Sequence, residues 1–401
     1  MNLHLADLKK CFGLEKTSLE RTGRILIVDG HNVVGYRVVD QLAYLDYPMI
    51  RVGVRNTDDF QVKRWELNEY IIERVTFDWN DESTYNVALE DVKTVFVTTP
   101  MTPGNWDVKF PKFLDACHRA KVKKIVKLSF YHSIKSKAEN PRQCFGSYFQ
   151  HQDQEYTAEP AYGIHDVPFV KKHALCDGDL ILRKEFDTTI IFATHLMSNV
   201  FRYGFERQGL MKDHEFYGAS QGKHVNYVSP NDVADIAMKA IFDDKGTMCS
   251  HTRQGYNVLG PFPLMDVEVA ALLSESLHTA ITYVEKPIDF FDKDTAALEN
   301  IKASGMEKDF PHGDFKRVMN RSPQSFREYL KETDRMSPVE RKVIGAFHPM
   351  KLDELEVFKK KEETKEEVEP ADDAEGFEVK AAAVEKEMDN TDQAATTQVA
   401  Q

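Results

Sequence analysis

Residues 24–35 read RILIVDGHNVVG: an apolar run breaks into a short polar turn, which ends at Gly35 and leads into a helical pattern. A strand, a tight turn and a helix N-terminus in this order can cradle a pyrophosphate, because backbone N–H groups there point toward the ligand. Glycines in the turn keep side chains away from the phosphates. The segment is therefore typical of the start of a dinucleotide-binding βαβ unit.

The glycine pattern of this turn is incomplete. When Gly35 is set as the third glycine of a G-x-x-G-x-x-G loop, Asp29 and Asn32 occupy the first two positions and Gly30 falls one place late. Asn tolerates a left-handed backbone better than most residues, whereas Asp29 is expected to hold a carboxylate close to an anionic ligand. We therefore predict nucleotide binding by a degenerate loop.

The second expected strand, residues 49–54, is followed by Arg55 and Asn56 rather than by an acidic residue. A carboxylate at this place accepts the ribose 2′-hydroxyl of NAD(H), whereas an arginine can pair with the 2′-phosphate of NADP(H). Arg55 therefore favours NADP(H) over NAD(H). The alternative is a solvated arginine at a strand end, which is common on protein surfaces.

Strands and helices alternate through the rest of the amino-terminal half. Further strands are expected at residues 75–78, 92–98 and 124–129, with a helix at 110–120 before the last of them. This alternation predicts an α/β fold with a doubly wound parallel sheet, whose ligand crevice lies at the carboxyl ends of the strands. Five polar residues fall on that edge: Arg55, Asp78, Thr98, Thr99 and Ser129.

In the order and spacing of its segments the chain resembles the NmrA-like branch of the atypical short-chain dehydrogenase/reductases, which have an NAD(P)-binding Rossmann fold. The likeness covers residues 22–335. It rests on the glycine-loop segment and on residues 54–56, 77–81, 95–101, 113–129, 188–199, 226–241 and 256–277. Because the family holds both reductases and non-catalytic redox-state sensors, the likeness is more specific for the fold than for an activity.

The resemblance implies roles for the matching residues. The loop would wrap the pyrophosphate, Arg55 would take the adenosine 2′-phosphate, Asp78 would lie near the adenine, and Ser129 would sit beside the nicotinamide. The implied cofactor-binding residues are Gly30, His31, Asn32, Val33, Val34, Gly35, Arg55, Asn56, Asp78, Thr98, Thr99, Pro100 and Ser129.

Catalytic residues are harder to assign. Tyr131 and Lys135 satisfy a Y-x-x-x-K pattern but follow Ser129 directly, where the family has a loop, so we interpret the match as chance. Lys172 and His173 lie near a Lys/His position that the family places at the head of the helix before the sixth strand. The alternative for this pair is a basic helix start on the surface. Cys176 and Gly178 stand where relatives often carry a glutamate.

A second lobe is expected from discontinuous pieces, about residues 136–170, 196–224 and 255–335, with helices at 266–277 and 323–331. The first piece reads as a long irregular excursion, which in a compact domain is usually functional. Its aromatic residues could line an apolar substrate pocket or pack the insert onto the core: Phe145, Tyr148, Phe149, Tyr156 and Tyr162.

Composition excludes several classes of protein. No apolar run is long enough to span a bilayer, and the amino-terminal extension, residues 1–21, lacks the apolar core of a secretory signal. The five cysteines never show C-x-x-C spacing, and the fourteen histidines form no ligand motif. We therefore expect reduced thiols, a cytoplasmic location and no metal site.

The last part of the chain changes character. Residues 336–358 read as a connector, and residues 359–401 as a disordered acidic tail, since from Lys351 onward sixteen Asp and Glu stand against seven Lys. The acidity argues against a direct nucleic-acid ligand for the tail.

Two functions of different classes remain open. One is an NADP(H)-dependent oxidoreductase acting on a small carbonyl or quinone-like substrate. The other is a non-catalytic NADP(H) redox sensor that acts through a protein partner. The aromatic insert favours the first, whereas Asp29, Asn32 and the missing glutamate favour the second.

The tail is predicted to be dispensable. Truncation after Phe358 removes a segment with few large apolar residues, so the thermal midpoint and the nucleotide affinity should stay unaltered while the isoelectric point rises. Differential scanning fluorimetry and a binding titration check this. A midpoint several degrees lower would instead mean that the tail docks on the body.

Overall fold

The computed structural model describes residues 23–57, 72–98, 106–131, 168–201, 209–242, 254–304, 313–332 and 335–347. The chain divides into two compact units, Met1–His348 and Pro349–Gln401. All described residues belong to the first unit. The predictions for the amino-terminal extension, the aromatic insert and the acidic tail lie outside the described residues, except for residues 168–170 at the end of the insert.

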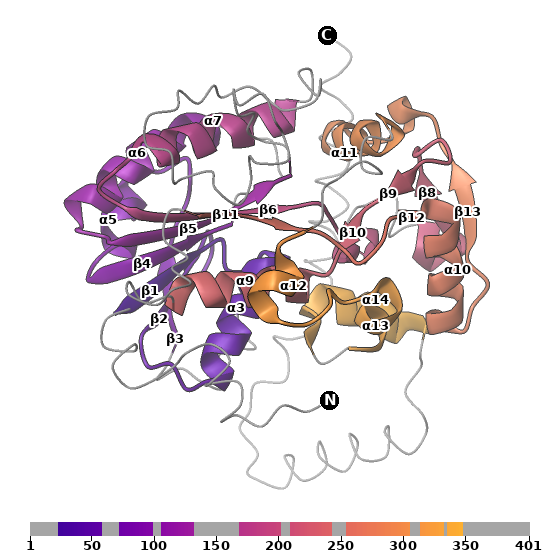
Figure 1. The fold of residues 1–401 in the computed structure, drawn as a ribbon, viewed down its shortest axis with the longest axis horizontal. Helices are drawn as coiled ribbons and strands as arrows, with labels where there is room; N and C mark the ends of the chain where they lie inside the picture. Colours follow the sequence, from indigo (N-terminus) through magenta and orange to yellow (C-terminus); the bar gives the residue numbers. More distant parts are fainter. Residues whose placement is uncertain are drawn as a thin grey trace, which may run out of the picture. The chain divides into compact units, whose positions relative to one another are not determined.

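A seven-stranded sheet organises this unit (Figure 1). Its strands are β1 (Arg24–Val28), β2 (Ile50–Val54), β3 (Ile72–Thr76), β4 (Val92–Val97), β5 (Lys124–Phe130), β6 (Asp187–Ala193) and β11 (Gln254–Val258). They are ordered β11-β6-β5-β4-β1-β2-β3, and every pairing is parallel. The direction of winding reverses between β1 and β4, where such folds form a ligand crevice. The predicted doubly wound sheet is confirmed.

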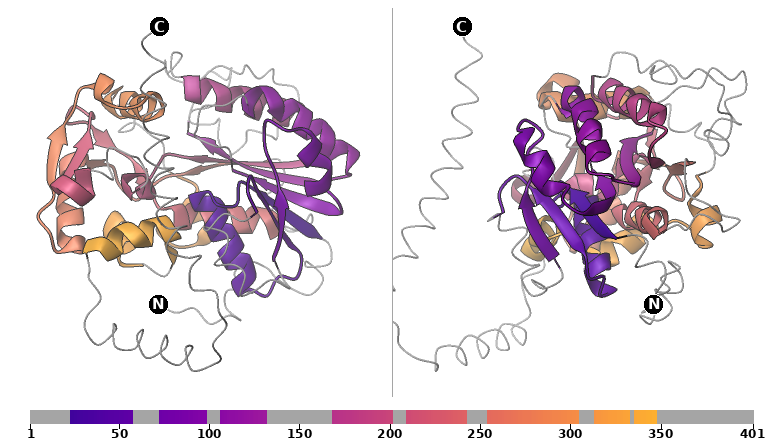
Figure 2. Two further views of the ribbon diagram at one scale, coloured as in Figure 1. Left: turned by 180° about the vertical axis from the view of Figure 1, so that it is seen from behind. Right: turned by 90° about the vertical axis from the view of Figure 1, so that its left-hand side faces the viewer.

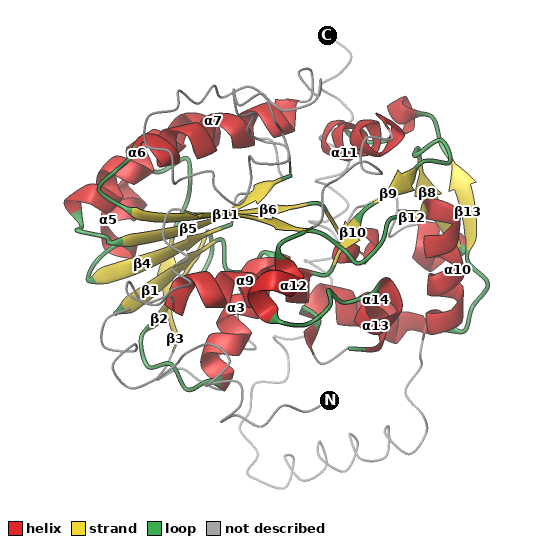
Figure 3. Ribbon diagram, in the orientation of Figure 1, coloured by secondary structure: helices red, strands yellow, loops and turns green. Residues whose placement is uncertain are grey.

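Helices cover both faces of the sheet (Figures 1 and 3). One face carries α3 (Val33–Tyr44), α9 (Pro230–Phe242) and α12 (Phe315–Met319), and the other carries α5 (Ser83–Ala88), α6 (Trp106–Arg119) and α7 (Pro168–Leu182). In β1, Ile25 and Ile27 join the core under α3, while Leu26 and Val28 join the opposite core. Residues 25–28 of this central parallel strand are therefore all apolar and buried, as the sequence indicates.

The helix predicted at 110–120 is α6, which begins earlier, at Trp106, and the predicted strand bounds hold to within one residue except for the third strand. It was expected at residues 75–78, but β3 spans Ile72–Thr76, and Phe77 and Trp79 leave the sheet to pack against Tyr85 on α5. The reason is that β3 is an edge strand, in which only Ile72 and Val75 are buried. Charged residues lie between these two, so the strand lacks the continuous apolar run by which the other strands were predicted.

A second group of elements forms the smaller lobe (Figure 2). It contains the short strands β7 (His195–Leu196), β8 (Glu215–Gly218), β9 (His224–Val225), β10 (Tyr227–Val228), β12 (Leu264–Met265) and β13 (Thr282–Glu285), paired as β10-β7, β12-β9 and β13-β8. Its helical elements are η4 (Met197–Phe201), η5 (Gly209–Asp213), α10 (Asp266–Leu277), η6 (Ile288–Phe290), α11 (Lys293–Ser304), α13 (Phe326–Lys331) and α14 (Pro338–Phe347). The predicted helix at 266–277 is confirmed. The helix predicted at 323–331 begins at Phe326, because Ser325 and Glu328 form a capping box there.

Helix α14 lies in the same compact unit as the sheet, within the stretch that the sequence assigned to a connector. Its Glu340 forms a bidentate ion pair with Arg37 on α3, with N–O distances of 2.9 and 3.1 Å. Both side chains are buried. Arg37 Nε also donates to Asn231 Oδ1 at 2.6 Å, and the Tyr329 hydroxyl donates to Glu340. The first helix of the sheet domain is thereby tied to the last described helix.

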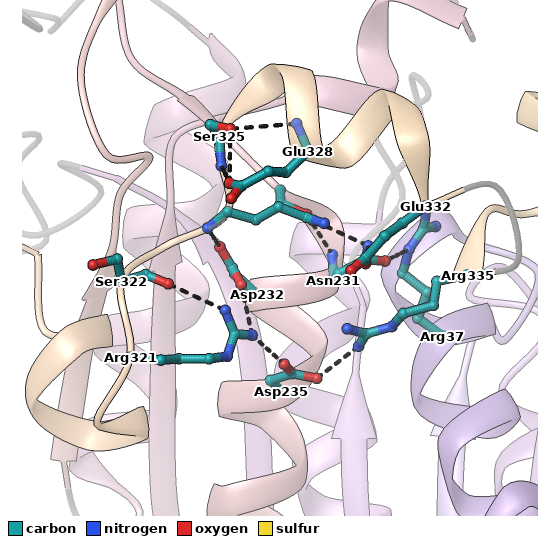
Figure 4. A network of polar contacts seen from close by, with 12 residues as sticks. Arg37, Asn231, Asp232, Asp235, Arg321, Ser322, Ser325, Glu328, Glu332 and Arg335 are labelled. Carbon is teal, nitrogen blue, oxygen red and sulfur yellow. Dashed lines mark hydrogen bonds and ion pairs between the residues drawn. The ribbon is translucent and has the colours of Figure 1, made fainter. Parts of the chain in front are cut away.

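A second set of ion pairs lies beside this one (Figure 4). Asp235 on α9 accepts hydrogen bonds from Arg321 and Arg335, at 2.5 and 2.7 Å, and Arg321 also bonds Asp232 at 2.9 Å. Burial opposes ionisation of Asp235, but the two guanidinium groups outweigh it and lower the pKa of this carboxyl. The segment from α12 to α14 therefore docks on α9 and α3 through charges.

None of the helices in the described ranges is long and apolar enough to cross a membrane.

Removing one partner of the Arg37–Glu340 pair should strongly destabilise the protein. Glu340→Gln leaves a buried guanidinium without its counter-charge, which we expect to lower the free energy of unfolding by about 3 kcal/mol. Urea unfolding measures the loss. The control is Glu275→Gln, which breaks an exposed pair with Arg327 and should cost less than about 1 kcal/mol.

The same measurement applied to a truncation after Ser337, which deletes α14, should give a larger loss than Glu340→Gln. If Glu340→Gln cost no more than Glu275→Gln, α14 would not depend on this pair.

Candidate functional site

The turn between β1 and α3 differs from the predicted one in where it bends. Asp29 has the left-handed backbone, with φ of +53°, whereas Asn32 has φ of −58° and ψ of 147°. Asn32 therefore does not use the left-handed backbone that Asn tolerates. Asn32 is instead the N-cap of α3: its side-chain oxygen accepts the Val34 N–H at 3.0 Å.

Gly35 allows α3 to lie close to this turn. A Cβ atom on Gly35 would be 3.0 Å from the Asp29 carbonyl oxygen and 3.2 Å from the Gly30 Cα, so a side chain there would push the helix away. The Gly30 N–H donates to the Gly53 carbonyl at 3.2 Å. Val33 and Val34 are buried in the core, so only their backbone can face a ligand, whereas His31 is partly exposed on the turn.

The Asp29 carboxyl is directed to an indole. Its Oδ2 accepts the Trp79 Nε1–H at 2.8 Å. Burial raises the pKa of Asp29 to about 7, against the lowering effects of the Trp79 hydrogen bond and of Arg55. The sequence predicted a fixed negative charge beside the phosphates. Near neutral pH the group is instead balanced between its charged and neutral forms, so it opposes an anion less than an ordinary Asp would.

Two predicted rim residues meet at the ends of β2 and β3. Arg55 is 71% exposed, and its Nε lies 3.6 Å from Asp78 Oδ2. Asn56, next to it, is also exposed. A pair this open exchanges readily with solvent and ligands. The exposed guanidinium is therefore placed to receive an anionic group from solution.

Thr98 holds the turn from the neighbouring strand. Its Oγ1 donates to the Val28 carbonyl at 2.7 Å and lies 3.3 Å from the Asp29 carbonyl. It is buried, so it holds the turn rather than presenting its hydroxyl to a ligand. Thr99 and Pro100 lie outside the described residues.

A second polar cluster joins the carboxyl end of β5 to α7. The Ser129 hydroxyl donates to Asp177 Oδ2 and lies 3.4 Å from His173 Nδ1, and Lys127 Nζ pairs with Asp177 Oδ1 at 2.6 Å. Burial, together with the charge of Lys127, lowers the pKa of His173 well below its ordinary value. The imidazole is therefore neutral at physiological pH.

This cluster contains both predicted and unpredicted residues. Ser129 and His173 were expected at the site, whereas Lys172 turns to Asp107, with an N–O distance of 3.1 Å. Asp177 was missed, although it stands four residues after His173, the spacing that puts two side chains on one helix face. Lys127 was missed too, although a lysine inside an apolar strand is itself a signal of a buried partner. Of the Y-x-x-x-K pattern, Tyr131 is buried and Lys135 lies outside the described residues.

The described residues fit a dinucleotide at three points. Gly35 permits the close approach of α3 to the turn, Arg55 is open to a phosphate, and Ser129 lies at the end of β5, across the switch point. Three backbone N–H groups of the turn, those of Gly30, Asn32 and Val34, already have partners within the protein. The turn therefore has fewer donors to offer a pyrophosphate than an all-glycine loop.

No family model matches the chain. An NAD(P)H azoreductase of Xenophilus azovorans is 25% identical over 260 residues, which are 65% of this chain and 76% of the azoreductase. The prestalk A differentiation protein A of Dictyostelium discoideum is 24% identical over 270 residues, which are 66% of this chain and 74% of that protein.

Solved structures share the fold. An NADPH-dependent quinone oxidoreductase from Escherichia coli, in complex with NADPH, matches with a TM-score of 0.56 and 15% identity over 77% of this chain and 98% of that one. The negative transcriptional regulator NmrA, in complex with NAD, matches with a TM-score of 0.53 and 15% identity over 82% and 96%. The chain therefore shares the Rossmann fold of these two structures.

Asp29→Asn tests the state of the turn through the pH dependence of stability. The amide oxygen can still accept the Trp79 N–H, but the group no longer titrates. In the wild type the pKa rises from 3.8 to about 7 on folding, so stability falls as the pH increases across this window. We expect this pH-dependent loss of stability to be absent in the variant. The free energy of unfolding of Asp29→Asn, measured with urea, should therefore increase relative to that of the wild type from acid to neutral pH.

Asp46→Asn is the matched control, because Asp46 shares the left-handed backbone, with φ of +55°, but is exposed. Its stability curve should run parallel to that of the wild type. If the curve of Asp29→Asn ran parallel as well, the Asp29 carboxyl would not be buried as described.

Proposed function

We propose that this chain binds NADP(H) at the carboxyl edge of its sheet. The observation that carries the proposal is the pairing of two features on adjacent strands: the glycine-packed N-terminus of α3 after β1, and the exposed Arg55 after β2. The first suits a pyrophosphate, and the second suits a 2′-phosphate. The NADPH bound by the quinone oxidoreductase of the same fold supports this choice.

We further propose that the protein is an oxidoreductase for a small carbonyl, quinone or related acceptor. NADPH supplies the hydride in such a reaction. The residues of this chain would position the nicotinamide and the acceptor: Ser129, as a hydrogen-bonding hydroxyl at the end of β5, and His173, as a neutral imidazole beside it. The azoreductase similarity is consistent with a conjugated acceptor.

A non-catalytic NADP(H) sensor is the second candidate, and one observation favours it. Lys127, Ser129, His173 and Asp177 are each at most 4% exposed and bond one another. A group that hands a proton to a substrate must reach it. In the described part of the chain this cluster is closed, which suits a structural link between β5 and α7 as well as it suits catalysis. A sensor would pass its state to a protein partner.

A titration of the purified protein with NADPH and NADH, followed by a screen for cofactor oxidation with quinones, aldehydes and azo compounds, separates the candidates. Binding with turnover supports the oxidoreductase. Binding without turnover supports the sensor. Failure to bind either dinucleotide would overturn both.

The cofactor preference should depend on Arg55. We expect NADPH to bind more tightly than NADH, and Arg55→Ala to narrow the gap by about 1–3 kcal/mol, the value of a charge-assisted contact to the 2′-phosphate. Calorimetric titration measures both affinities. Arg327→Ala, another exposed arginine with an acidic partner, should leave the gap unchanged. Equal affinities of the wild type for NADPH and NADH would contradict the assignment of Arg55.

A further inference from the structure

One carboxyl group lies inside the proposed cofactor site. Asp29 follows β1 directly, and its Oδ2 accepts the indole N–H of Trp79, which lies beyond the end of β3, at 2.8 Å. In the sheet β2 stands between β1 and β3, so the side chain reaches across the end of β2. The carboxyl group therefore lies along the edge that runs from the N-terminus of α3 to Arg55, the two points at which a dinucleotide would bring its phosphates.

The negative charge of this group has little compensation. Its hydrogen bond comes from an indole, which is a neutral donor, and the side chain is partly buried. Among the described residues, the cation that acts on it is Arg55, which is 71% exposed and already faces Asp78. Burial outweighs both effects and raises the pKa of Asp29 to about 7. A small change in the surroundings therefore decides whether the group is charged at physiological pH.

A bound dinucleotide would disfavour the charged form of Asp29 in two ways. Its pyrophosphate would bring negative charge to the turn, where the N–H groups of Gly30, Asn32 and Val34 are already bonded within the protein. Its 2′-phosphate would neutralise Arg55, whose charge otherwise favours the carboxylate. Both changes favour protonation of the carboxyl group.

Two further ionisable groups of this edge could exchange a proton when a ligand binds: Asp78, after β3, and His31, within the turn. The first turn of α3 carries no acidic residue, and the residue after β4 is the uncharged Thr98. Residues 99–105, which lie outside the described ranges, contain no ionisable side chain. A test therefore has to distinguish Asp29 from Asp78 and His31.

We propose that the protein binds its dinucleotide together with a proton, which the carboxyl group of Asp29 takes up. The affinity for the cofactor is then greatest in mildly acidic solution and falls as the pH rises, because the ionised carboxyl group repels the phosphates. By reciprocity, the bound dinucleotide favours the protonated carboxyl group by the same free energy. This regulation rests on the proposed function, since it acts on the same site.

Calorimetric titration of the full chain with NADPH at a series of pH values tests the proposal. Between about pH 6 and about pH 8 the wild type should lose about tenfold in affinity relative to Asp29→Asn, because a group with a pKa of about 7 must be protonated for binding. The comparison with the variant cancels the titration of the 2′-phosphate itself, whose pKa is about 6.

The number of protons is measured in the same titration, with buffers of different ionisation enthalpy. At about pH 7 the free wild type is half protonated at Asp29, so it should take up about half a proton more per NADPH than Asp29→Asn does. A merely structural role of Asp29 would change the affinity without changing the proton count.

Four further substitutions separate Asp29 from its neighbours. Asp46→Asn removes an exposed carboxyl from another residue with a left-handed backbone, and His31→Gln removes the other ionisable group of the turn. Both should keep the proton uptake of the wild type. Trp79→Phe removes a hydrogen bond that lowers the pKa of Asp29, so the fall in affinity should move to higher pH. Asp78→Asn removes a negative charge that raises the same pKa, so the fall should move to lower pH.

If Asp29→Asn fails to fold, Asp29→Gly takes its place, because glycine adopts the left-handed backbone without strain. Equal pH dependence and equal proton uptake in the wild type and the Asp29 variant would overturn the inference and leave the proposed cofactor site standing. Loss of the uptake in His31→Gln would also overturn it, since the proton would then belong to His31. A wild type that bound no NADPH at any pH would overturn the proposed function and this inference together.

Discussion

The close contact between the first turn of α3 and the backbone after β1 is the constraint on which the rest of the structure depends. It exists because position 35 has no side chain: a Cβ there would lie 3.0 Å from the Asp29 carbonyl. Thr98 holds that same backbone from β4, at 2.7 Å from the Val28 carbonyl. Two residues after Gly35 on α3, Arg37 forms the bidentate pair with Glu340. The helix that would meet a phosphate is therefore also the helix that orders the end of the domain.

Buried ion pairs join distant parts of this chain. Arg37 and Glu340 are separated by 303 residues, and Lys127 and Asp177 by 50. Such pairs add little net stability, because the desolvation of both charges offsets their attraction. Their effect is on specificity, because an arrangement that left either charge buried without its counter-charge would be strongly destabilised. They select one arrangement of α7 on β5 and of α14 on α3.

The sequence predicted the sheet well, because its central strands are rich in β-branched and apolar residues. It failed where tertiary contacts override the local pattern. The bounds of β3 were predicted too late in the sequence. Glu73 and Arg74 interrupt the apolar residues of the strand itself, whereas the apolar Phe77 follows it outside the sheet. Helix α14 was taken for a connector, because the partner that stabilises its buried Glu340 lies at the other end of the chain. Asp177 escaped notice for the same reason, since its partners on β5 come from another element.

The departures of the turn from the glycine pattern compensate one another. A left-handed backbone at Asp29 puts strain where a glycine would carry none, but it directs the carboxyl to Trp79 and keeps it away from full ionisation at neutral pH. The Asn32 side chain accepts the Val34 N–H as the N-cap of α3. This hydrogen bond stabilises the helix and leaves one N–H fewer for a phosphate. A dinucleotide would therefore gain less binding free energy from the turn than from the guanidinium of Arg55, which would meet the other end of the ligand. If the chain binds a dinucleotide as proposed, binding would depend more on Arg55, which is 71% exposed beside a partly exposed Asp78, than on the loop itself.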